Sequence, residues 1–182
     1  MKTKRALLSI ALSAFIFSAS SMAASDNTIT FLGEVTDQTC SVSVNGATAS
    51  PIVLLPTVSI ADLTTNTTAG ATTFDIGVSD CAPSSTGVTI ASVFVGNNVG
   101  PTGNLANTID GSAGDVEIQV MNLDDSNPQP IDFSNVFNGA DDLSLDPNET
   151  SATATYTAQY YSSGAPAAGT VKASMQYAIS YP

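Results

Sequence analysis

Apolar side chains occupy every second position at the end of this chain: Ala173, Met175, Tyr177, Ile179 and Tyr181. Successive side chains of a β-strand point to opposite faces, so these residues would share one face of a strand. Residues 28–36 alternate in the same way, at Ile29, Phe31, Gly33 and Val35. The pattern predicts a β-domain that begins and ends in strands. Those two ends can pair within one molecule or between molecules.

The first 23 residues have the layout of a secretory signal peptide. Lys2, Lys4 and Arg5 precede an apolar stretch at 6–19, and small residues follow, with Ala23 at the expected cleavage point. The apolar stretch is too short to span a bilayer. Cleavage after Ala23 would leave residues 24–182, and the sequence predicts that this part is exported in soluble form.

Removal of residues 1–23 leaves Lys172 as the sole basic residue against 16 acidic residues, a formal charge of −15. Nucleic-acid binding needs Lys and Arg to neutralise phosphates, so this charge argues against a nucleic-acid partner. It also disfavours docking to an anionic membrane. Solubility outside the cell accounts for such a charge, and a basic protein partner is compatible with it.

Cys40 and Cys81 are the only cysteines. In an exported protein such a pair predicts a disulfide. The closed loop is long enough for the bond to contribute about 4 kcal/mol in the chain-entropy treatment. Structural zinc usually takes four Cys or His ligands, and the chain has no His, so we expect no metal and no cofactor.

Short segments rich in Thr, Val and Ser are separated by Gly, Pro and Asn clusters, which is typical of an all-β sandwich or barrel. Asn45-Gly46 is a strong turn signal. We expect a single helical turn at 60–63 and loops at 97–104, 138–150 and 162–169. The predicted strands are residues 28–36, 40–44, 52–55, 72–79, 88–95, 116–122, 152–161 and 171–181.

Five features occur together in a fixed order: the signal peptide, the run 28–35 leading to Cys40, a second cysteine about forty residues later, a Tyr161/Gly164/Gly169 pattern, and a closing strand with a penultimate Tyr. In this combination the chain resembles a pilin subunit of the chaperone–usher pathway, of the kind found in type 1 and P fimbriae. The resemblance divides the chain into a signal peptide (1–23), an N-terminal extension (24–36) and a pilin domain (37–182).

The resemblance implies an immunoglobulin-like sandwich that lacks its last strand and is completed by a donor strand from a neighbouring subunit. Ile29, Phe31, Gly33 and Val35 match the donor-strand positions, and Gly33 would lie where the groove is shallow. Leu32 departs from the pattern, because it is an apolar residue on the outward face. The implied partners are other pilin subunits, a periplasmic chaperone and an outer-membrane usher. The protein would pass through the periplasm and become part of a fimbrium used in cell adhesion.

The same resemblance assigns the chaperone contacts to the closing strand. Met175, Tyr177, Ile179 and Tyr181 would line the groove, and the carboxylate of Pro182 would be held by basic residues of the chaperone.

The alternatives to a pilin are an enzyme, a calcium-binding loop and a self-complete sandwich. An enzyme is disfavoured because His and Arg are absent after residue 23, and neighbouring carboxylates such as Asp141 and Asp142 seldom provide the separation that a glycosidase needs. The acidic loop at 141–149 has oxygen ligands suited to calcium but not the usual spacing. The remaining alternative is a secreted, self-complete β-sandwich that acts as a binding module or minor adhesive subunit.

Overall fold

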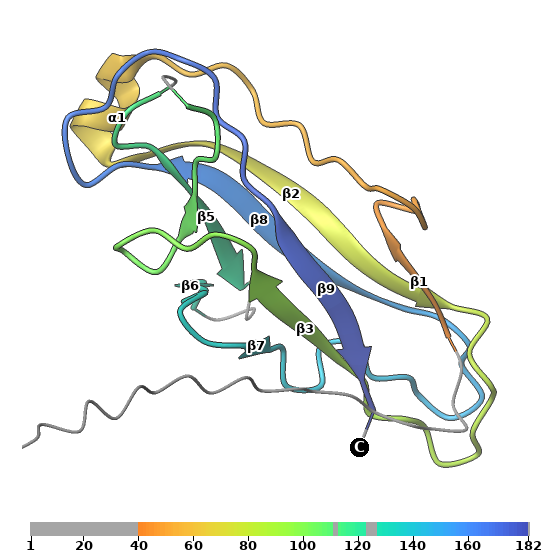
Figure 1. The fold of residues 1–182 in the computed structure, drawn as a ribbon. Coiled ribbons are helices and arrows are strands. Elements are labelled where there is room, and N and C mark those ends of the chain that lie inside the picture. Colours follow the sequence, from red (N-terminus) through yellow and green to blue (C-terminus); the bar gives the residue numbers. More distant parts are fainter. Residues whose placement is uncertain (1–39, 111–112, 123–126, 182) are drawn as a thin grey trace, which may run out of the picture. The chain divides into compact units, whose positions relative to one another are not determined.

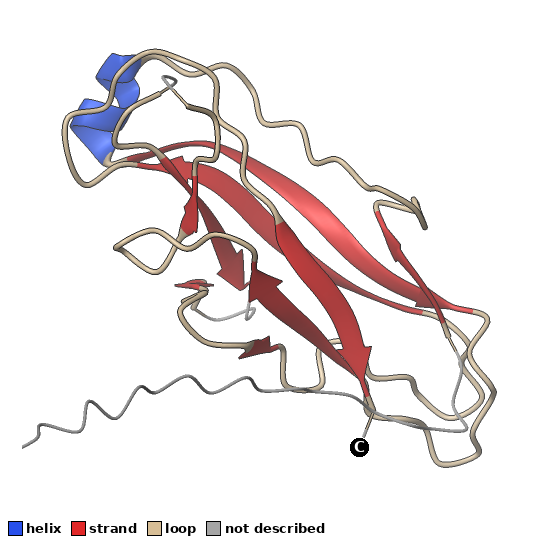
Figure 2. Ribbon diagram, in the orientation of Figure 1, coloured by secondary structure: helices blue, strands red, loops and turns tan. Residues whose placement is uncertain are grey.

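The computed structural model describes residues 40–110, 113–122 and 127–181, all within one compact unit. Apart from one short helix, its regular secondary structure consists of antiparallel strands joined by loops (Figures 1 and 2). Its one described helix is too short to cross a membrane. The elements are β1 (Ser41–Val44), α1 (Ile60–Asn66), β2 (Thr68–Ser79), β3 (Ala91–Gly96), β4 (Leu105–Ala106), β5 (Glu117–Asn122), β6 (Gln129–Pro130), β7 (Phe137–Asn138), β8 (Ala152–Tyr161) and β9 (Met175–Ser180).

The strands form two sheets. The larger sheet has the order β1-β2-β8-β5-β4, with β6 also paired to β5, and the smaller has the order β7-β3-β9. The long β2–β8 ladder places Phe74 opposite Tyr156 and Ile76 opposite Ala154, so alternate residues of both strands face inward. These side chains pack against Phe94 of the smaller sheet, and all of them are buried. The predicted all-β sandwich is confirmed.

Turn chemistry fixes the local geometry where the sequence predicted it. Asn45 and Gly46 both have positive φ, and Val44 and Ala47 exchange backbone hydrogen bonds of 2.9 Å across them. This is the two-residue hairpin turn that an Asn-Gly pair favours. Gly70 has a different reason to be glycine. It has a φ of +68°, a Cβ there would lie 2.9 Å from Val58, and the β2 ladder shifts register at this point.

The helical segment is longer than the single turn expected at 60–63. Ser59 caps α1, its hydroxyl accepting a 3.1 Å hydrogen bond from the Asp62 backbone N–H, while the Asp62 carboxylate accepts from Ser59. These bonds from Ser59 hold the pKa of Asp62 below its ordinary value. Leu63 is buried and anchors the helix. The pattern Ser-x-x-Asp is a helix-start signal and marks the observed start at Ile60, but it does not indicate the end at Asn66.

The observed strand boundaries agree best with the predicted ones where both strands of a pair are long. Strand β8 coincides with the predicted 152–161, whereas β3 begins at Ala91 because Val88 makes only an isolated bridge to Leu145. The expected strand at 52–55 is wrong, since these residues belong to no ladder in the structure. The predicted strand 28–36 lies outside the described residues.

Candidate functional site

Strand β9 is an edge strand of the smaller sheet. All its residues pair with β3, from Met175 opposite Gly96 to Ser180 opposite Ala91. Within the described chain no strand is paired to its other edge (Figure 1). An edge strand presents a row of peptide groups that can pair with another strand, so this edge is a candidate site for strand addition.

The alternating apolar residues of the closing strand share one face, as the sequence predicted. Met175, Tyr177, Ile179 and Tyr181 are half-buried and pack against the main core, whereas Gln176 and Ala178 between them are exposed. Inward residues that remain partly accessible show that the cover over this side of the core is incomplete. Pro182 lies outside the described residues.

A second extended segment, residues 51–55, borders the same region. It connects β1 to α1 without strand pairing and is drawn as a loop in Figure 2. Val53 and Leu55 are half-buried against the core, but Ile52 and Leu54 are each 84% exposed. This segment therefore has the alternation of a strand and a half-buried apolar face, yet no hydrogen-bonded neighbour among the described residues.

Between these two borders lies an open groove of about 600 Å³. Its floor comes from β2, β5 and β8 of the larger sheet, and its sides come from residues 51–55 and from 171–177. Among the described residues that line it, Lys172 is the only charged one. The floor residues are Phe74, Ile76, Ile118, Val120, Ala158 and Tyr160. A long apolar groove flanked by two extended segments suits an alternating apolar strand as occupant.

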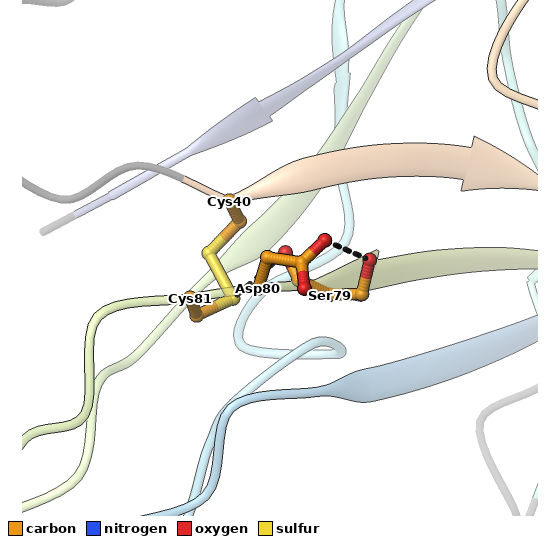
Figure 3. Close-up of a disulfide and its surroundings, with 4 residues drawn as sticks. All are labelled: Cys40, Ser79, Asp80 and Cys81. Atoms are coloured by element: carbon orange, nitrogen blue, oxygen red, sulfur yellow. Dashed lines mark hydrogen bonds between the residues drawn. A yellow bond between two sulfur atoms is a disulfide. The ribbon is translucent and has the colours of Figure 1, made fainter.

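The predicted disulfide between Cys40 and Cys81 is confirmed (Figure 3). It joins the residue before β1 to the chain just beyond β2, where β1 and β2 are neighbours in the sheet and Ser41 lies opposite Ser79. Cys81 is buried, and its backbone N–H donates to the Thr150 carbonyl. The bond thus fixes the start of the domain, where residues 1–39 join it.

The acidic loop residues that suggested catalytic or calcium chemistry have structural partners. The phenol of Tyr156 donates to Asp142 Oδ2, and the Ser92 backbone N–H donates to Asp142 Oδ1 over 2.7 Å. Burial, together with the bond to Asp142, raises the pKa of Tyr156 above its ordinary value. Further along the loop, Glu149 accepts from the Asp146 backbone N–H. In the described residues no group of three or more His, Cys, Asp or Glu is placed to hold a metal ion.

Sequence reasoning missed both the Tyr156–Asp142 pair and the groove border at 51–55. A Tyr at an inward position needs a partner for its hydroxyl, which is a signal for the pair but does not identify the partner. Residues 52–55 were predicted to form a strand, and the sequence did not indicate that they border a groove. Ile29, Phe31, Gly33 and Val35, predicted to be the donor strand, lie outside the described residues.

Comparison with known proteins gives consistent results. Residues 55–182 match the family described as FimA, type-1 fimbrial protein, A. The F17 fimbrial protein of Escherichia coli is 34% identical over 90% of this chain and 92% of its own length. The major fimbrial subunit SMF-1 of Stenotrophomonas maltophilia is 34% identical over 87% of this chain and 94% of its own.

Two solved structures share the fold. The P pilus rod subunit PapA has a TM-score of 0.59 at 19% identity, over 79% of this chain and 99% of PapA. A chaperone–usher pilus subunit, from a study of rod uncoiling, has a TM-score of 0.56 at 20% identity, over 90% of this chain and 100% of that one. The family match and the two relatives agree, and the chain therefore belongs to the type-1 fimbrial protein family.

Proposed function

We propose that this pilin polymerises by strand exchange, in which the extension 24–36 of one subunit fills the groove of the next. The observation that carries the proposal is the apolar groove beside the unpaired edge of β9. Adding a strand there satisfies the peptide groups of that edge and covers the half-buried residues of 171–181. Membership of the pilin family supports the structural role of the subunit in a fimbria, and no chemistry in the described residues points to an enzyme.

The residues at the donor positions are apolar, like the groove. Ile29, Phe31 and Val35 would enter the apolar groove, and burying three side chains of this size contributes roughly 5–8 kcal/mol before ordering costs. Gly33 has no side chain and lets the backbone approach the floor closely. Main-chain hydrogen bonds to β9 add to this and slow dissociation.

Before assembly the groove needs a temporary occupant, because an exposed apolar edge promotes aggregation. We assign this role to a periplasmic chaperone that contacts Met175, Tyr177, Ile179 and Tyr181 and holds the carboxylate of Pro182. Export through the signal peptide 1–23 would deliver the subunit to the periplasm, and an outer-membrane usher would pass it to the growing fibre.

The test is the pair Phe31→Asp and Thr30→Asp, introduced in the native host. These positions are adjacent, but only Phe31 is on the inward face of the donor strand. Surface protein is sheared off and run in SDS with and without heating in acid. We expect Thr30→Asp and the unchanged chain to give a ladder of multiples that collapses only after harsh treatment.

Phe31→Asp should give no ladder, while the subunit still co-purifies with its chaperone, because the donor segment is not used in that complex. A normal ladder from Phe31→Asp would overturn the donor assignment. A single band from the unchanged chain under both conditions would instead indicate a self-complete sandwich.

A further inference from the structure

Lys172 has an unusual position for the sole basic residue beyond the signal peptide. It lies at the lip of the groove, where every other lining residue is uncharged. In the described chain its interactions are made by its backbone. Its N–H donates to Asn107 Oδ1 over 3.1 Å, and its carbonyl accepts from the Thr108 N–H over 2.8 Å. The backbone is thus fixed, and none of these bonds uses the ammonium group.

Lys172 is one of the exposed residues of the closing segment. From 171 to 178 the odd-numbered residues are half-buried and the even-numbered ones, Lys172 included, are exposed. In the donor segment the inward positions are odd-numbered too, so Thr30, Leu32 and Glu34 would face outward. Side chains on the same face of neighbouring strands form cross-strand pairs. In the proposed complex, Lys172 and Glu34 would therefore lie on the same face of neighbouring strands, and their charges are opposite.

Strand direction decides which acidic residue reaches Lys172. Every ladder in the described sheets is antiparallel, and antiparallel pairing is slightly more stable per residue. An antiparallel donor that aligns Val35 with Ala173 brings Glu34 opposite Ser174 and diagonal to Lys172, a separation that a long side chain spans. A parallel donor would bring the opposite end, with Asp26, to Lys172.

We propose that Lys172 pairs with Glu34 of the next subunit's donor segment and thereby selects the antiparallel direction and the register of the inserted strand. The proposal rests on the strand exchange proposed above. The apolar positions alone specify direction weakly, because Ile29, Phe31 and Val35 differ little in character. A charge pair at one end of the groove makes the two directions unequal.

The test uses assembled fibres of the full chain and a charge swap: Lys172→Glu, Glu34→Lys, and both together. Depolymerisation in urea at low ionic strength is followed on SDS gels. Each single change should speed depolymerisation about three- to fivefold, and the double change should restore the original rate within about twofold. At about 0.5 M salt the differences should shrink, because the charges are screened.

The matched control is Asp26→Lys, alone and with Lys172→Glu, which should not restore the rate. If a charge-reversed variant does not assemble, Lys172→Gln and Glu34→Gln are used in its place. Each of these single changes should speed depolymerisation by the same factor as the two changes together. Unchanged rates, additive effects in the swap, or restoration by Asp26→Lys would overturn the proposal. A failure of strand exchange itself is distinguishable, because Phe31→Asp would then still polymerise.

Discussion

At the scale of single residues, Tyr156 links the two sheets. Its side chain is 1% exposed, stacks on Phe74 of the larger sheet at 5.8 Å, and meets the edge of Phe94 of the smaller sheet at 4.9 Å. Its hydroxyl also holds Asp142, whose other oxygen accepts from β3 at Ser92. A loop that the sequence presented as a run of carboxylates is thus attached to the core.

Replacing Tyr156 by Phe should lower the free energy of unfolding of the mature chain by about 1.5–3 kcal/mol, because the change leaves a carboxylate without its buried donor. Urea unfolding followed by circular dichroism measures this. Thr153→Val on the same strand changes an exposed side chain and serves as the control. Equal stability of Tyr156→Phe and the original chain would show that the bond to Asp142 contributes nothing net.

The raised pKa of Tyr156 has a consequence at alkaline pH. The unfolded chain releases this proton near pH 10 and the folded chain only at higher pH, so stability is fully present below about pH 10 and falls as the pH rises above it. Tyr156→Phe should lose less stability than the original chain between about pH 10 and 11. An equal loss in both chains would assign the alkaline sensitivity to the other tyrosines.

At the scale of elements, the sequence predicts a strand well when its partner lies in the same chain. Strand β8 was predicted with its observed bounds because it is central in the larger sheet and its inward face is buried by its own domain. Strands β4, β6 and β7 were missed, since pairs of residues are too short to show alternation. The closing strand was found, but its pattern could not reveal that the groove beside it is open.

Residues 51–55 show the same limit of predicting strand pairing from alternation. Their alternation predicted a strand. The structure has an extended segment with Val53 half-buried against the core and Leu54 exposed, but it is not paired to any described strand. Periodicity records that one face is covered. It does not show which molecule covers that face. The wrongly predicted strand at 52–55 therefore lies at the border of the proposed groove.

Val53→Asp should therefore reduce fibre yield about tenfold or more, because an unpaired carboxylate facing an apolar groove costs several kcal/mol. Thr57→Asp, at a nearby exposed position outside the described groove lining, should polymerise normally. Sheared fibre from each strain is measured on gels, with periplasmic subunit measured alongside to separate assembly from folding. Equal yields from the two variants would mean that the segment does not border the acceptor site.

At the scale of the whole molecule, charge governs how assembled subunits meet one another. Removal of the predicted signal peptide 1–23 would leave sixteen acidic residues against Lys172, a formal charge of −15 for each subunit. Fibres built from such subunits repel at neutral pH, and salt screens that repulsion. In the strand exchange proposed above, the strand-to-groove contact is mainly apolar, with Lys172 and Glu34 as its one proposed charge pair, so it should depend little on the net charge. Assembly and lateral association of fibres should thus respond differently to pH.

Fibres should stay dispersed at pH 7 in low salt and bundle as the pH falls towards 4, because protonated carboxylates no longer repel. The isoelectric point of about 4.1 for the full sequence, which loses three basic residues with the signal peptide, places the transition at or below that pH. Light scattering measures bundling, and SDS gels should show the same ladder at both pH values. Replacing the exposed Asp110 and Asp146 by Lys should move bundling to higher pH. Fibres that instead fall apart into subunits at pH 4 would show that charge acts within the strand-to-groove contact as well as between fibres.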